Sequence, residues 1–193
     1  MKKVNLLLLA ASFATLLQAC NSHKSASASD STTTKTDSTE TTDKADSSGA
    51  VLSDTAFAAK AAVGGMAEVA LGKMAASKST DSKIKDFGNM MVTDHGKANA
   101  ELMGVAKAKN ITLPGGLDVE HQAKSDSLGK LSGKDFDVAY VNAMIDGHKK
   151  TLALMQSEAA NGKDADLKAF AAKTAPVVKM HLDAIMKIHA SMK

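Results

Sequence analysis

The stretch Met90-Met91-Val92-Thr93-Asp94-His95 lies in the middle of a long run with helical periodicity, from about residue 81 to 109. It places an ionisable pair, Asp94 and His95, where the apolar face of that helix should continue. Similar polar interruptions fall on the apolar stripes of other expected helices, at Glu68, His148 and His181. Burying such groups costs stability unless they are partnered. The pattern therefore predicts a helical bundle with a polar centre.

The spacing of apolar residues predicts four long helices and one short helix, and no strand. The expected ranges are about 54–77, 81–109, 117–131, 135–160 and 164–191. Short connections within the first and last pairs predict two antiparallel hairpins, and the connection over 110–134 is long enough to cross the bundle from end to end. The predicted fold is all-α, a ferritin-like four-helix bundle with a long crossover that carries an extra short helix.

Two features inside the helices predict local adjustments. Gly64-Gly65 lowers helix stability, so we expect a neighbouring helix to approach closely there. Pro176 removes one backbone donor from the last helix, so we expect a kink at that position.

Composition excludes several classes of function. The net charge of +3 is small and dispersed, and no run alternates basic with aromatic residues, so no nucleic-acid partner is expected. There is no nucleophile elbow, phosphate loop or CxxC motif, which leaves hydrolase, kinase and thiol-redox functions without support. Cys20 is the only cysteine, so an internal disulfide is impossible.

The amino-terminal segment has the pattern of an exported lipoprotein. Lys2 and Lys3 precede an apolar segment, and Leu17-Gln18-Ala19-Cys20 resembles a bacterial lipobox, which implies that Cys20 carries lipid after cleavage of residues 1–19. The alternative is a free thiol in a discarded peptide. Residues 20–50 offer little to bury and are predicted to form a disordered Ser/Thr/Asp/Lys tether, followed by the bundle domain at 51–193. By resemblance, Asn21 favours the outer membrane, with the domain facing the periplasm or cell surface.

The four polar interruptions are expected at similar depths in the bundle. Counting about 1.5 Å per residue puts His95 and His148 at one level, and Glu68 and His181 at another about 6 Å away. Asp94 and Asp146 would lie at the edge of this zone, and His121 of the short helix would cap it.

Imidazoles and a carboxylate together suit zinc, iron or copper. Because neutral imidazole is the ligand form, metal binding would weaken as the pH falls through about 6.5. The alternative is an internal polar hydrogen-bond network, and at the level of sequence that alternative is preferred.

Two specific metal sites lack their usual signatures. A ferritin-type di-iron site uses a Glu-x-x-His on each of two helices. Here Val92 stands three residues before His95, and Val178 three before His181. The methionines are scattered, without a Met-x-x-Met cluster, and methionine is a common core filler, so a thioether copper site is not favoured.

Three runs of sequence carry a family resemblance. They are GGMAEVALGKMAASKSTDSKIKDFGNMMVTDHGKANAELMGVAKAKNITLP (64–114), LSGKDFDVAYVNAMIDGHKKTLAL (131–154) and LKAFAAKTAPVVKMHLDAIMKI (167–188), with His121 between the first two. Over about residues 54–191 the chain resembles the bacterial domain-of-unknown-function family 4142. The resemblance implies an exported protein, often described as an outer-membrane protein, with a ferritin-like helical fold. The family's characteristic positions fall on Glu68, Asp94, His95, His121, residues 133–140, His148, Pro176 and His181.

Three functional hypotheses follow. The first is a lipid-anchored envelope module, non-catalytic, that binds a ligand or protects against stress and whose His/Glu centre can hold a metal. The second is a structural or interaction protein whose histidines only hold the helices in register. The third is a degenerate metal-dependent oxidase. The absence of Glu-x-x-His pairs disfavours the oxidase hypothesis. The expected buried ionisable groups favour the binding module over a purely structural protein. The membrane, through Cys20, is the one predicted partner.

Overall fold

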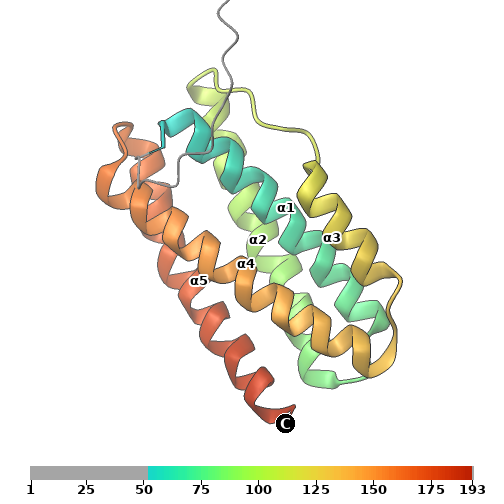
Figure 1. The fold of residues 1–193 in the computed structure, drawn as a ribbon. Coiled ribbons are helices and arrows are strands. Elements are labelled where there is room, and N and C mark those ends of the chain that lie inside the picture. The colour runs from blue at the N-terminus through green and yellow to red at the C-terminus, as the bar shows by residue number, and fades with distance from the viewer. Residues whose placement is uncertain (1–51, 193) are drawn as a thin grey trace, which may run out of the picture. The chain divides into compact units, whose positions relative to one another are not determined.

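The computed structural model describes residues 52–192, and this range contains five α-helices and no strand (Figure 1). The predicted all-α fold is therefore confirmed. Within the same range, none of the helices combines the length and hydropathy needed to cross a membrane. The five helices are α1 (Asp54–Lys78), α2 (Ser82–Ala108), α3 (Val119–Gly129), α4 (Gly133–Asn161) and α5 (Ala165–Ser191).

Capping side chains set where four of the helices begin. Each accepts a hydrogen bond from a backbone N–H of the first turn, which would otherwise lack a partner. Because Asp118 takes this role for α3, that helix begins at residue 119 rather than at the expected 117. The capping residues are Ser53, Asp81, Asp118 and Asp164.

The start of α4 and the end of α2 depend on residues with positive φ. α4 begins at Gly133 (φ 56°), two residues before the expected start. α2 ends with Asn110 in the left-handed conformation (φ 57°). There the N–H of Ile111 donates to the carbonyl of Ala106 at 2.9 Å, and the N–H of Asn110 to that of Lys107 at 3.2 Å. These two bonds form a Schellman motif, which turns the chain out of α2 into the crossover.

The helices form two antiparallel hairpins joined by the crossover. Residues 79–81 connect α1 to α2, and residues 162–164 connect α4 to α5. α1 also packs against α4, and α2 against α5, which closes the bundle. Figure 1 shows α3 lying along the outside of α1. The expected arrangement of hairpins and crossover is therefore observed.

The core consists of two apolar clusters with a polar layer between them. One cluster contains Phe87, Tyr140 and Ile185, and the other contains Phe57, Leu102 and Phe170. In every long helix a buried ionisable residue lies between its contributions to the two clusters. These residues are Glu68 in α1, His95 in α2, His148 in α4 and His181 in α5.

α1 and α2 approach closely next to this layer. A Cβ placed on Gly72 would lie 2.6 Å from the carbonyl oxygen of Gly88, and one on Gly88 would lie 2.6 Å from the carbonyl of Gly72. At the predicted pair, a Cβ on Gly65 would overlap the side chain of Asn99 in α2, whereas a Cβ on Gly64 would approach only Thr151 Oγ1, at 4.0 Å. The expected close approach is therefore present at Gly65, and a second one, between the two backbones, lies two turns further along at Gly72 and Gly88. α5 continues through Pro176 as one helix.

Candidate metal centre

Four helices each contribute one buried side chain to the polar layer. Glu68, His95, His148 and His181 are all at most 5% exposed. The three imidazoles, which we call the His triad, have ring centroids 5.1 to 5.6 Å apart. One nitrogen from each ring lies within 4.8 Å of the other two. The triad thus brings three nitrogens that could bind a metal ion from three helices into one small region of the core.

One nitrogen of each imidazole meets an oxygen atom that fixes the ring. His95 Nδ1 lies 2.8 Å from Glu68 Oε2, a contact between α2 and α1. His148 Nδ1 lies 2.8 Å from the carbonyl oxygen of Met144, one turn earlier in α4. His181 Nε2 lies 3.0 Å from Asp94 Oδ2, a contact between α5 and α2. Metal-ligating histidines are held by oxygen partners of this kind.

The opposite nitrogen of each imidazole has no hydrogen-bond partner among residues 52–192. These atoms are His95 Nε2, His148 Nε2 and His181 Nδ1, and all three are buried. Most buried polar atoms in proteins have a partner, and leaving one without a partner costs about 1–3 kcal/mol. Three such atoms in one cluster are free to act as ligands, and imidazole nitrogen is a ligand for transition metals.

Burial sets the protonation states of the centre. It lowers the pKa of His148, and it lowers that of His181 to about 4 even though Asp94 favours the charged form. Both rings are therefore neutral at pH 7, which is the metal-binding form. Burial alone would raise the pKa of Glu68, but the contacts with His95 outweigh it and the pKa is lowered, so this carboxyl is ionised. His148 and His181 therefore take up protons at a lower pH than an ordinary imidazole, whose pKa is about 6.5.

Aromatic residues close the triad on one side. The ring of Phe87 lies 5.9 Å from that of His148 and 6.5 Å from that of His181. Tyr140 packs edge-on against Phe87, with 6.4 Å between ring centroids, and its buried hydroxyl has no partner in the described part of the chain. Burial, together with the charge of Glu68, raises the pKa of Tyr140 above its usual range.

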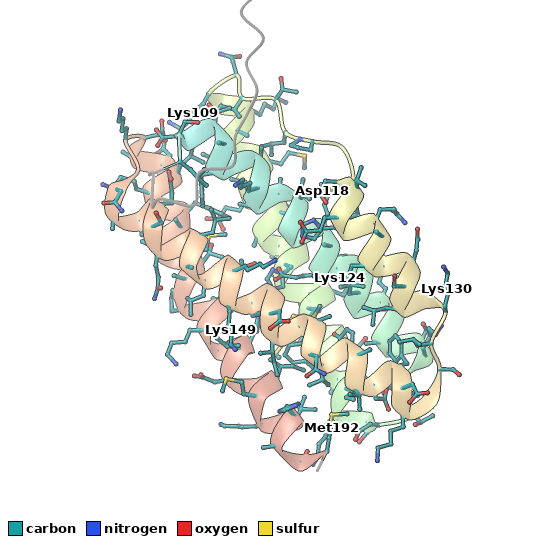
Figure 2. All side chains as sticks on the ribbon, in the orientation of Figure 1. Lys109, Asp118, Lys124, Lys130, Lys149 and Met192 are labelled. Carbon is teal, nitrogen blue, oxygen red and sulfur yellow. The ribbon has the colours of Figure 1, made fainter. Side chains whose placement is uncertain are left out.

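On another side, a pocket of about 480 Å³ reaches the centre between α1, α3 and α4. Glu68 lines this pocket, and none of the three histidines of the triad does. Two residues that line the pocket, Asp118 at the cap of α3 and Lys124 within α3, are labelled in Figure 2. Thr151 of α4 also lines it and donates from Oγ1 to Glu68 Oε1 at 3.3 Å.

The other residues that the sequence assigned to the centre lie outside the His triad. Asp94 lies behind His181 with a side chain that is 30% exposed. His121 is not part of the triad; its Nδ1 lies 2.6 Å from Asp118 Oδ1, and its side chain lines the pocket. Asp146 is exposed on α4, so its expected place at the edge of the centre is wrong. Cys20 lies outside the described residues.

Some contacts of the centre had no counterpart in the sequence analysis. Thr151 could have been noticed, because it stands three residues after His148 and so shares its face of α4. The Met144 carbonyl and the ring of Phe87 had no such signal, because a backbone acceptor and an apolar neighbour look like any other helical core position.

A sequence comparison identifies the family. The profile described as "Domain of unknown function (DUF4142)" matches residues 35–188. The chain belongs to the DUF4142 family. The match covers the whole of the bundle from α1 into α5, and with it every residue of the centre. No curated protein matches this DUF4142 chain.

Solved structures with a similar fold carry metal ions. "CopM in the Cu(II)-bound form" has a TM-score of 0.63 at 13% identity, covering 74% of this DUF4142 chain and 99% of that one. "CopM in the Ag-bound form (by co-crystallization)" has a TM-score of 0.60 at 13% identity, covering 72% and 97%. At this level of identity the likeness establishes a shared fold.

Proposed function

We propose that this protein binds one transition-metal ion in its core, through the three imidazoles of the His triad. The observation that carries the proposal is the arrangement of the six ring nitrogens. Three lie next to oxygen atoms, and the other three are buried and have no partner among residues 52–192. This is the arrangement that orients histidines around a metal.

A purely structural role for the histidines is the alternative. Edge-on packing of the imidazoles favours it, because His95 and His148 lie 5.5 Å apart with ring planes at 82°. Such packing would not compensate for three unpartnered nitrogens, each costing about 1–3 kcal/mol. Helices could be held in register at lower cost by apolar residues, so the metal site is the better explanation.

Copper is the ion that we propose first, with zinc as the competitor. Imidazole ligands suit both, and Cu²⁺ binds such sites more tightly than the other divalent ions of its row. The fold neighbours described as Cu(II)-bound and Ag-bound support this choice. The centre differs from a di-iron oxidase site because only one carboxylate, Glu68, lies within the buried layer.

Copper(II) bound to the full chain reports its ligands directly. Titrating the metal-free protein should give a single strong site whose electron paramagnetic resonance spectrum shows coupling to imidazole nitrogens. His148→Ala should lose that signal, whereas His189→Ala, on the partly exposed face of α5, should keep it. A spectrum typical of oxygen ligands alone would contradict the proposal.

The metal site is proposed to lie in the cell envelope, on a lipid-anchored protein. The Leu17 to Cys20 lipobox and the polar residues 20–50 support this location, as does the resemblance to exported proteins. Several acyl chains on one cysteine would anchor the domain firmly, at about 0.8 kcal/mol per buried CH₂. Cys20→Ala should release the protein from the membrane fraction and change its electrophoretic mobility. Unchanged retention and mobility would contradict lipidation.

A further inference from the structure

We infer that the pocket between α1, α3 and α4 is the route by which the metal ion reaches the His triad, with Glu68 as the residue that passes it inward. This inference rests on the proposed metal site. The pocket has a volume of about 480 Å³, large enough for a hydrated ion. It brings solvent space to Glu68, a residue of the buried layer.

Glu68 belongs to both the pocket and the centre. Its side chain lines the pocket, yet its Oε2 lies 2.8 Å from His95 Nδ1 and its Oε1 lies 3.8 Å from His148 Nδ1. A cation in the pocket would therefore meet a carboxylate that already contacts two of the three ligand rings. Carboxylate oxygen also binds divalent ions, so Glu68 can hold the ion before the imidazoles do.

Two glycines, which have no side chain to fill the space, keep the pocket open. Gly64 of α1 and Gly147 of α4 both line it, and a Cβ on Gly147 would meet no atom within 4 Å. A Cβ on Gly64 would approach only Thr151 Oγ1, at 4.0 Å. Neither glycine is needed for close helix packing, unlike Gly72 and Gly88. Each lowers helix stability relative to alanine by about 1 kcal/mol, and an open passage accounts for that cost.

Groups suited to a cation lie in the outer part of the pocket. The Asp118–His121 pair and Glu120, all from α3 or its cap, line it. Lys60, Lys124 and Lys150 line it as well, and Lys150 lies 3.6 Å from Glu120. The lining is thus close to neutral, so an ion arriving with its own ligand would not be repelled. Glu68 is the one ionised group at the buried end.

Filling the pocket should slow metal binding without weakening it. We would prepare the full chain with Gly64→Leu, and separately with Gly147→Leu, each in a Cys20→Ala background so that the thiol cannot bind copper. Circular dichroism would show that each protein is folded. The probe is Cu(II), mixed rapidly with metal-free protein while absorbance is followed, and the affinity is measured at equilibrium.

Each leucine variant should bind Cu(II) at least tenfold more slowly, with an affinity within threefold of the parent. The matched control is Gly104→Leu, an exposed glycine of α2 that meets no atom within 4 Å and does not line the pocket. It should bind at the parent rate. Unchanged rates in both pocket variants would overturn the route. Absence of Cu(II) binding in the parent and in Gly104→Leu would instead overturn the proposed metal site itself.

Discussion

Glu68 Oε2 lies 2.8 Å from His95 Nδ1, which joins α1 to α2 inside the polar layer. The same carboxylate accepts from Thr151 of α4 at 3.3 Å, so one side chain connects three helices at the level of the His triad. Buried among apolar clusters, this anion is stabilised by its contacts with His95. This contact orients the ring of His95 and keeps negative charge next to the proposed metal site.

Removing this charge should weaken the metal site. Glu68→Gln keeps the size of the side chain but removes the anion that faces His95, and loss of such a partner typically lowers metal affinity about 10–100-fold. Isothermal titration with Cu(II) measures the change. Glu101→Gln, on an exposed part of α2, is the matched control and should bind like the parent. Equal affinity for both variants would show that Glu68 does not support the centre.

The contact between Asp94 and His181 predicts a second effect on affinity. Asp94→Ala removes the oxygen that lies 3.0 Å from His181 Nε2 and leaves that ring free to rotate. Metal affinity should again fall by about 10–100-fold. Asp86→Ala, an exposed aspartate on the same helix, provides the comparison. If Asp94→Ala and Asp86→Ala bind Cu(II) equally well, the contact is dispensable for binding.

The depth of the four buried ionisable residues in the bundle could be predicted from the sequence, because helices have a regular rise per residue. Counting residues along each stripe placed Glu68, His95, His148 and His181 in one zone, and the structure brings them together. The partner of each ring nitrogen could not be predicted, because it depends on side-chain rotamers and, for His148, on the backbone carbonyl of Met144. The unpartnered nitrogens, which turn the preference from a polar network to a metal site, appear only in three dimensions.

The pocket could not be predicted from the sequence, for a different reason. Its outer wall is α3, in which Leu128 is the single buried residue, so periodicity carries little information on how this helix packs. His121 was expected to cap the centre from this helix, and in the structure it pairs with Asp118 in the pocket wall. Gly64 was read as a contact point between helices, yet it lines the pocket.

The stability of the metal-free protein should fall as the pH falls from about 6.5 to about 4. In the unfolded chain His181 titrates near pH 6.5, whereas in the folded chain burial lowers its pKa to about 4. Between these values the unfolded state binds a proton that the folded state does not, which favours unfolding. Each unit of pKa difference is worth about 1.4 kcal/mol.

Urea unfolding at pH 7 and pH 5, in the presence of a chelator, measures this slope. His181→Leu should reduce it, because the substituted chain no longer gains that proton on unfolding. His189→Leu, at a partly exposed position of the same helix, should leave it unchanged. The same slope in His181→Leu as in the parent would show that His181 does not titrate as the structure indicates.

The close approach of α1 and α2 predicts opposite effects for two similar substitutions. Gly72→Ala would place a Cβ 2.6 Å from the carbonyl oxygen of Gly88 and should destabilise the fold by about 1–3 kcal/mol. Gly104→Ala meets no atom within 4 Å and should stabilise α2 by up to about 1 kcal/mol. Thermal unfolding of both variants gives the signs directly. A stable Gly72→Ala protein would mean that the helices can separate at this point without cost.

Metal content per chain tests the central claim most directly. Full chain with Cys20→Ala, purified with Cu(II) and freed of excess ion, should contain one copper by elemental analysis, and adding His121→Ala should not remove it, because His121 lies outside the triad. The double variant His95→Ala, His181→Ala should contain none while still giving a helical circular dichroism spectrum. Copper retained in the double variant, or no stoichiometric copper in the parent, would contradict a metal centre at the His triad.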